Sequence, residues 1–227
     1  MRRVILLFSA VLLGSNGWSQ TLNIHYKNGQ SVQFDAENIE YVEFTEKAEN
    51  NTSVTAGDAI DLGLSVKWAS CNVGATSPEE FGDKLAWGET STKNRYSSTT
   101  YIYYNEQTES YMNIGIDIKS TDYDAAYIKW GGIWRMPTDK ELRELKNNCN
   151  WEWAQINGVN GYKVTGKNGN SIFLPYAKEF TIFWASTLSS QNGTNMYANV
   201  LAFTNGGQFY DSYMRYVGGY VRPVCPK

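Results

Sequence analysis

Nucleophilic catalysis needs a base, a nucleophile and an orienting group held together, and the chain has a single histidine, His25, to supply the usual base. His25 lies in an alternating run near the N-terminus, away from the bulk of the sequence. We therefore interpret it as a surface residue on a strand. The sequence also has no glycine-rich loop followed by Lys and Ser or Thr, which excludes the usual phosphate-binding loop.

Paired carboxylates could in principle supply acid and base catalysis. The candidates are Glu79 with Glu80, and Asp122 with Asp124. Their neighbours are polar, so we interpret them as exposed negative charges that favour helix starts. The sequence thus predicts no catalytic residues, and we expect the protein not to be an enzyme.

The three cysteines, Cys71, Cys149 and Cys225, are far apart in the sequence. A zinc site needs closely spaced ligands, so no metal site and no cofactor are predicted. In an exported protein, one disulfide and one free thiol is the default expectation, and three pairings remain open.

The residue types that favour ligand recognition gather near the C-terminus. Tyr combined with Asn and Ser is typical of adaptable binding surfaces. Period-two alternation should send one subset outward while Leu201 and Phe203 pack inward. An ordinary solvated ribbon is the open alternative, because Tyr favours strands in any context. The predicted ligand-binding residues are Asn199, Gln208, Tyr210, Asp211, Tyr213 and Tyr216.

Residues 1–19 have the pattern of a secretory signal peptide: Arg2 and Arg3, a short apolar run, then small and polar residues. The run is shorter than the ~20 residues of a membrane span, and no cysteine follows it as a lipid anchor. We expect a secreted, periplasmic or cell-surface protein. Removal of this segment leaves 18 basic and 23 acidic residues, a formal charge of −5. That charge argues against nucleic-acid partners and anionic membrane surfaces.

Behind the signal peptide, residues 20–44 predict a small β-hairpin module with its turn at Asn28-Gly29 and a possible third strand over 39–44. Residues 45–57 are polar and predict a linker. The main domain should cover 58–227. Its C-terminal half is rich in alternating runs, which predict strands over 162–165, 171–174, 183–186, 196–204, 208–213 and 220–224.

Helical signals come earlier in the main domain. Thr138 and Glu141 form a capping-box pattern after Pro137, and Leu142 and Leu145 make an apolar stripe. A shorter helix is expected at 124–127. Residues 62–68 predict a strand and 93–113 a long surface loop. Few helices followed by antiparallel strands indicate the α+β class.

Six segments carry a resemblance to a known family: Asp61–Ala75, Phe81–Asp83, Ala86–Glu89, Trp130–Glu141, Phe183–Thr187 and Tyr220–Val224. Together they resemble the Fibrobacter succinogenes major paralogous domain family of exported Bacteroides-type proteins. The resemblance covers residues 58–226 and implies a C-type lectin-like fold related to the formylglycine-generating sulfatase-modifying domain. The cysteine pair of those enzymes and the calcium-binding motifs of sugar-binding lectins have no match in the chain.

These observations predict an exported, non-catalytic recognition or adhesion protein that binds a glycan or a protein through its C-terminal strands and loops. The Tyr, Asn, Asp and Ser content of that region is also compatible with diversification by a retroelement. One alternative is a structural cell-surface or fimbria-associated component whose N-terminal strands pair by edge addition. A second alternative is a degenerate enzyme of the sulfatase-modifying type.

Overall fold

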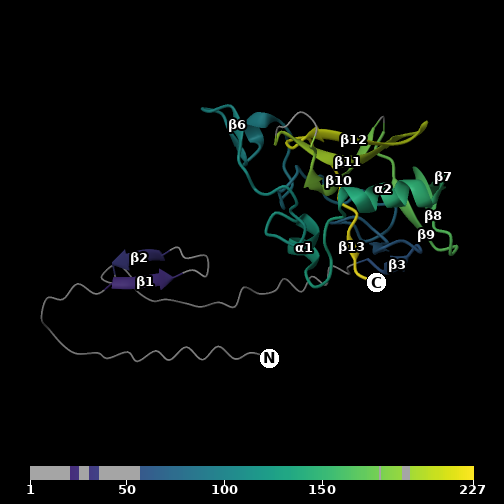
Figure 1. Ribbon diagram of the computed structural model, residues 1–227, viewed down its shortest axis with the longest axis horizontal. Helices are drawn as coiled ribbons and strands as arrows, with labels where there is room; N and C mark the ends of the chain where they lie inside the picture. The colour runs from purple at the N-terminus through teal and green to yellow at the C-terminus, as the bar shows by residue number, and fades with distance from the viewer. Residues whose placement is uncertain (1–20, 26–30, 36–56, 179, 191–194) are drawn as a thin grey trace, which may run out of the picture. The chain divides into compact units, whose positions relative to one another are not determined.

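The computed structural model describes residues 21–25, 31–35, 57–178, 180–190 and 195–227. The chain divides into two compact units, Met1–Asn50 and Asn51–Lys227. In the first unit, β1 (Thr21–His25) and β2 (Ser31–Asp35) pair in antiparallel register (Figure 1). Several predicted features lie outside the described residues: the signal peptide, the Asn28-Gly29 turn, the run 39–44 and most of the linker.

The second unit is built mainly from antiparallel sheets with two α-helices, which places it in the α+β class as predicted. Its largest strands form two three-stranded sheets. One contains β10 (Thr181–Leu188), β11 (Tyr197–Thr204) and β12 (Gly207–Met214) in that order. The other contains β7 (Asn150–Ile156), β8 (Val159–Thr165) and β9 (Ser171–Pro175).

The remaining elements are short. A third sheet joins the ends of the unit in the order β13 (Val224–Cys225), β4 (Lys67–Ala69) and β3 (Ala59–Asp61). A two-stranded sheet pairs β5 (Tyr104–Asn105) with β6 (Ser110–Tyr111), after a 3₁₀ turn, η2 (Ser98–Thr100). The helices are α1 (Ala125–Trp130) and α2 (Asp139–Asn148).

Helix α2 begins where the sequence predicts, and its capping box is formed. The N–H of Glu141 donates to Thr138 Oγ1 at 3.3 Å, and the N–H of Thr138 donates to Glu141 Oε2 at 2.8 Å. These bonds satisfy N–H groups that a helix start leaves without partners. The apolar stripe, Leu142 and Leu145, is fully buried. Helix α2 lies beside β10 and β11, which it contacts (Figure 1).

The β10–β11–β12 sheet is covered on both faces, so β11 alternates between two apolar clusters. Leu201 and Phe203 pack with α2 and the β7–β8–β9 sheet. Val200 and Ala202 pack on the other face with residues such as Trp87 and Met136. The prediction that Leu201 and Phe203 pack inward is confirmed, but their neighbours do not face solvent. A central strand is buried on both sides because each face of its sheet carries a separate layer.

Four of the sequence interpretations require correction. Residues 62–66 are irregular between β3 and β4, and only Val224 and Cys225 form the final strand. Strand β7 was not predicted. Residues 93–113 are not simply a surface loop, because Tyr101 and Tyr111 are buried beside Ala86. The aromatic rings of that segment have enough apolar area to drive its packing without regular periodicity.

The expected disulfide is also absent, since all three cysteines are free. They lie in different surroundings. The Cys71 thiol donates to the Ala75 carbonyl at 3.4 Å. Cys225 packs in a small cluster with Ala69 and Trp134, whereas Cys149 ends α2 and packs against the α2-side core. Burial raises the pKa of the Cys149 thiol to about 11, so this thiol is poorly reactive at neutral pH.

Candidate functional site

A groove of about 780 Å³ forms where four segments meet. Such a volume is within the range of small-molecule sites, about 300–1,000 Å³. The segments are residues 116–119, the first turn of α2, the end of β10 and the residues around the start of β11. Its polar lining consists of Asp117, Lys119, Thr138, Asp139, Lys140, Thr187, Ser189, Ser190, Asn195 and Asn199; Ile116 and Leu188 are apolar.

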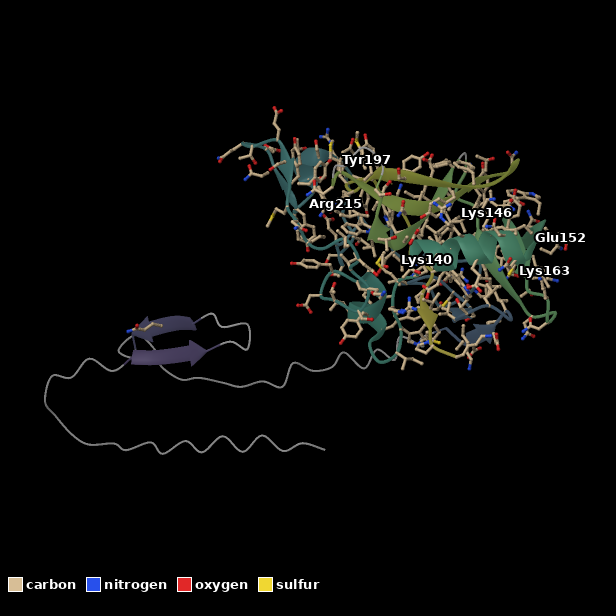
Figure 2. The ribbon with its side chains drawn as sticks, in the orientation of Figure 1. Lys140, Lys146, Glu152, Lys163, Tyr197 and Arg215 are labelled. Carbon is tan, nitrogen blue, oxygen red and sulfur yellow. The ribbon has the colours of Figure 1, made fainter. Side chains whose placement is uncertain are left out.

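The α2 wall of the groove is held from behind by an ion pair. Arg135 contacts both carboxylate oxygens of Glu141, at 2.8 and 2.6 Å. Burial opposes ionisation of Glu141, but the bonds from Arg135 and Thr138 lower the pKa of this carboxyl below its ordinary value. The same carboxyl caps the helix, so Arg135 fixes the first turn that presents Thr138 and Lys140 to the groove. Figure 2 shows Lys140 near the start of α2 and Lys146 towards its end.

The opposite wall is anchored through Asp117. Its Oδ1 accepts from the buried Ser186 hydroxyl at 2.6 Å, and its Oδ2 lies 2.8 Å from the Lys119 ammonium. Burial disfavours the Asp117 anion, but the bonds from Lys119 and Ser186 prevail and lower its pKa. Backbone bonds from Ile118 to Ser186 and from Leu188 to Ile116 add to the attachment. The irregular segment 116–119 is thereby fixed beside β10.

Asn199 is the predicted binding residue that lines the groove. Its side-chain NH₂ donates to the Leu188 carbonyl at 3.0 Å and to Thr187 Oγ1 at 3.3 Å. Within the described part of the chain its Oδ1 has no hydrogen-bond partner. Both amide protons are occupied, so the orientation of the amide is fixed and Oδ1 remains as an acceptor.

Tyr210 is not directed freely outward as expected. It lies opposite Leu201 in the β11–β12 register, on the face covered by α2. The Arg143 guanidinium carbon lies 3.5 Å from its ring centroid, and its hydroxyl is buried without a hydrogen-bond partner among the described residues. Burial raises the pKa of Tyr210. Tyr210 is therefore a packing residue beneath α2.

The other predicted residues are dispersed. Asp211 is exposed and Tyr213 packs on Phe180 at 5.3 Å between ring centroids, on the face of β12 opposite Tyr210. Gln208 lies opposite Phe203 near the turn, and Tyr216 packs with the Tyr101 cluster. The six residues thus do not form a single site, because alternation along β12 divides them between two faces.

The acidic pairs also have local roles. Asp124 is buried, which corrects the expectation of an exposed carboxylate, and its Oδ1 accepts from Ala126 and Tyr127 as the cap of α1. Burial raises its pKa although four backbone N–H groups bind the carboxyl. Glu79 accepts from Asn157, and Glu80 accepts from Thr76. These contacts agree with structural roles at turns and helix starts.

The groove wall at Asn195 is attached to a buried cation. Arg215 is fully buried, and its Nη1 donates to the Asn195 carbonyl at 3.1 Å and to the Met112 carbonyl at 2.9 Å. The Asn195 side chain donates to the Tyr111 carbonyl at 3.0 Å. Arg215 follows β12 (Figure 2). Its backbone N–H donates to the Met196 carbonyl. It therefore connects the segment around Asn195 to β6.

The residues around the groove were mostly not predicted. Asp117, Thr187 and Asn195 lie in irregular segments or at strand ends, where no periodicity marks them.

Among the described residues, no group of three or more His, Cys, Asp or Glu side chains is placed to hold a metal ion. In the same residues no helix is long and apolar enough to cross a membrane. No protein-family model, curated protein or solved structure matches the chain.

Proposed function

We propose that the protein is an exported, non-catalytic recognition protein whose second unit has a C-type lectin-like fold. Export is supported by the charged and apolar pattern of residues 1–19. The fold is supported by the resemblance of residues 58–226 to the Fibrobacter succinogenes family, together with the α+β architecture. The ligand is a glycan or a protein segment small enough to enter the groove.

The observation that carries this proposal is the groove of about 780 Å³ beside Asn199. Ligand sites are concave and present a few fixed polar groups that orient the ligand. Asn199 is such a group, because two hydrogen bonds hold its amide and leave Oδ1 as an acceptor. Arg135, Ser186 and Arg215 brace the walls from behind. This bracing reduces the conformational entropy that ordering the site would cost on binding.

The test is a binding screen of the purified protein on a glycan array and a panel of immobilised proteins. Asn199→Ala should weaken binding of any ligand found by about tenfold, the effect of losing one oriented hydrogen bond. Asn147→Ala is the matched control, because Asn147 is exposed on α2 and does not line the groove. Circular dichroism would show that both variants are folded.

Binding that is equally strong in the wild type and in Asn199→Ala would place the ligand elsewhere and contradict the proposal. So would the absence of any ligand in the screen. Equal weakening by Asn199→Ala and Asn147→Ala would indicate a general effect on α2 or on folding rather than contact in the groove.

A further inference from the structure

The charged side chains of the groove balance one another. Two aspartates and two lysines line it, so their formal charges cancel. Asp117 is paired with Lys119 at 2.8 Å, and Asp139 lies 3.9 Å from Arg143. A charged ligand would have to compete with these pairs to contact Asp117, Lys119 or Asp139. The lining therefore has no overall charge that would favour a charged ligand over an uncharged one.

The remaining polar lining consists of hydroxyl and amide groups. Thr138, Thr187, Ser189 and Ser190 carry hydroxyls, and Asn195 and Asn199 carry amides. Hydroxyls both donate and accept hydrogen bonds. Such a lining matches a ligand whose own polar groups are hydroxyls, because each can be satisfied without transferring a charge out of water.

Asn199 and Thr187 form an acceptor and donor pair. Thr187 Oγ1 accepts from the Asn199 NH₂ at 3.3 Å, so the Thr187 proton remains available to donate. The neighbouring Asn199 Oδ1 is a carbonyl oxygen and can accept a hydrogen bond. The Asn199 NH₂ group already donates to Thr187 Oγ1 and to the Leu188 carbonyl. A single ligand hydroxyl, or two on adjacent carbons, can accept from Thr187 while donating to Asn199.

The apolar part of the groove suits the other face of such a ligand. Ile116 is 80 % exposed and lines the groove together with Leu188. A saccharide has hydroxyls around its ring and C–H groups on its faces. Packing those C–H groups on Ile116 and Leu188 removes apolar surface from water.

We propose that this groove binds an uncharged saccharide, with Asn199 Oδ1 and the Thr187 hydroxyl recognising one hydroxyl or a vicinal pair. The inference rests on the proposed function and specifies its ligand class. It places recognition at the junction of β10 and β11 with α2. The tyrosines of β12 then contribute to the framework and do not contact the sugar.

The experiment compares neutral oligosaccharides with matched oligosaccharides that carry a uronic or sialic acid, on an array and then by calorimetry. Neutral sugars should bind, and their Kd should be insensitive to added salt because no ion pair forms. Thr187→Val, which keeps the shape but removes the hydroxyl, should raise Kd about tenfold. Thr187→Ser should retain binding within about threefold, because it keeps the donor.

The possible outcomes test the class of ligand and the location of the binding site separately. If only acidic sugars or proteins bind, with a salt-dependent Kd that Asn199→Ala raises, the inference of an uncharged saccharide is overturned and the groove remains the site. Neutral sugars that bind equally well to Thr187→Val and Asn199→Ala overturn both proposals. Thr187→Val also keeps the test valid if Asn199→Ala does not fold. If no neutral sugar binds, the inference is overturned.

Discussion

Arg222 and Arg215 are both completely buried, yet their guanidinium groups are held by different kinds of partner. Arg222 donates only to fixed oxygen atoms: Asn72 Oδ1 and the carbonyls of Ala69, Ser70 and Phe173. All three of its nitrogens are satisfied. These bonds join the segment following β4 to β9, so Arg222 connects two sheets of the scaffold.

Arg215 instead lies among aromatic rings. Its guanidinium carbon is 4.9 Å from the Trp87 ring, 5.4 Å from the Tyr101 ring and 5.5 Å from the Tyr111 ring. Its Nε donates to the Tyr101 hydroxyl at 2.9 Å, while its Nη2 has no hydrogen-bond partner in the described segments. In the described structure neither arginine has a carboxylate within salt-bridge distance.

The difference shows two ways to bury a cation without an anion. Carbonyl oxygens satisfy Arg222 through directional hydrogen bonds, which weaken steeply when the angle changes. Ring faces attract Arg215 through their quadrupoles, which adds to three hydrogen bonds. The first arrangement fixes regular strands to one another. The second holds irregular segments, including the Asn195 wall of the groove, where few backbone partners are available.

The largest expected effect follows from removing each arginine. Arg222→Met leaves four acceptors without this donor, three of them in buried bonds, and should lower the free energy of unfolding by about 3 kcal/mol or more. Arg215→Met should cost less, about 1–3 kcal/mol, because two of its acceptors are only partly buried and water can reach them. Urea denaturation measures both values.

Arg95→Met is the matched control, since Arg95 is exposed, and it should change stability by less than about 0.5 kcal/mol. A larger loss of unfolding free energy for Arg215→Met than for Arg222→Met would contradict this comparison. It would mean that Arg215, which holds the groove wall, stabilises the unit more than Arg222, which joins two sheets.

A smaller effect separates hydrogen bonding from ring contact at Arg215. Tyr101→Phe keeps the ring but removes a hydroxyl that accepts from Arg215 Nε and donates to the Trp87 carbonyl at 2.7 Å. It should cost about 1–2 kcal/mol. Tyr111→Phe also keeps its ring against Arg215 and should cost less than about 0.5 kcal/mol. Equal losses in thermal denaturation would mean that the Tyr101 hydroxyl bonds add nothing to the ring contacts.

The smallest effect is the pH dependence that Tyr111 gives to the Arg215 side. Burial raises the pKa of Tyr111 to about 12, whereas an unfolded tyrosine ionises near pH ~10. Its contribution to stability is therefore complete below pH ~10 and is lost as the pH rises towards 12. Absorbance at the tyrosinate band should follow this titration.

Tyr111→Phe is the control for that titration. Its melting temperature should fall less than that of the wild type between pH 9 and pH ~11. An identical fall in the melting temperature of Tyr111→Phe would show that Tyr111 is not the source of the pH dependence.

The sequence predicts α2 well, because the signals for this helix are local. The Thr138 and Glu141 cap lies within one turn, and Leu142 and Leu145 mark one face. The strands β8 to β12 follow their alternating runs for the same reason. Asn199 was also predicted as a binding residue, and the structure places it in the groove.

Alternation along β12 predicts which residues share a face, but not what covers each face. Arg143 from α2 covers Tyr210, and Phe180 contacts Tyr213. The composition that suggested one binding surface is therefore divided between two layers of packing. The groove itself was not predicted, since Asp117 lies in an irregular segment and Thr187 lies at the end of β10, where the strand register shifts.

By itself, the sequence determined the helix cap, the strand pattern, the α+β class and the candidate Asn199. These depend on residues within a few positions of one another, where backbone geometry relates spacing directly to direction. Only the tertiary structure decided the free state of the cysteines, the groove and the environments of the two buried arginines. Arg215 bonds a hydroxyl 114 positions away and Arg222 an amide 150 positions away. Such contacts depend on how the layers pack, which local spacing does not encode.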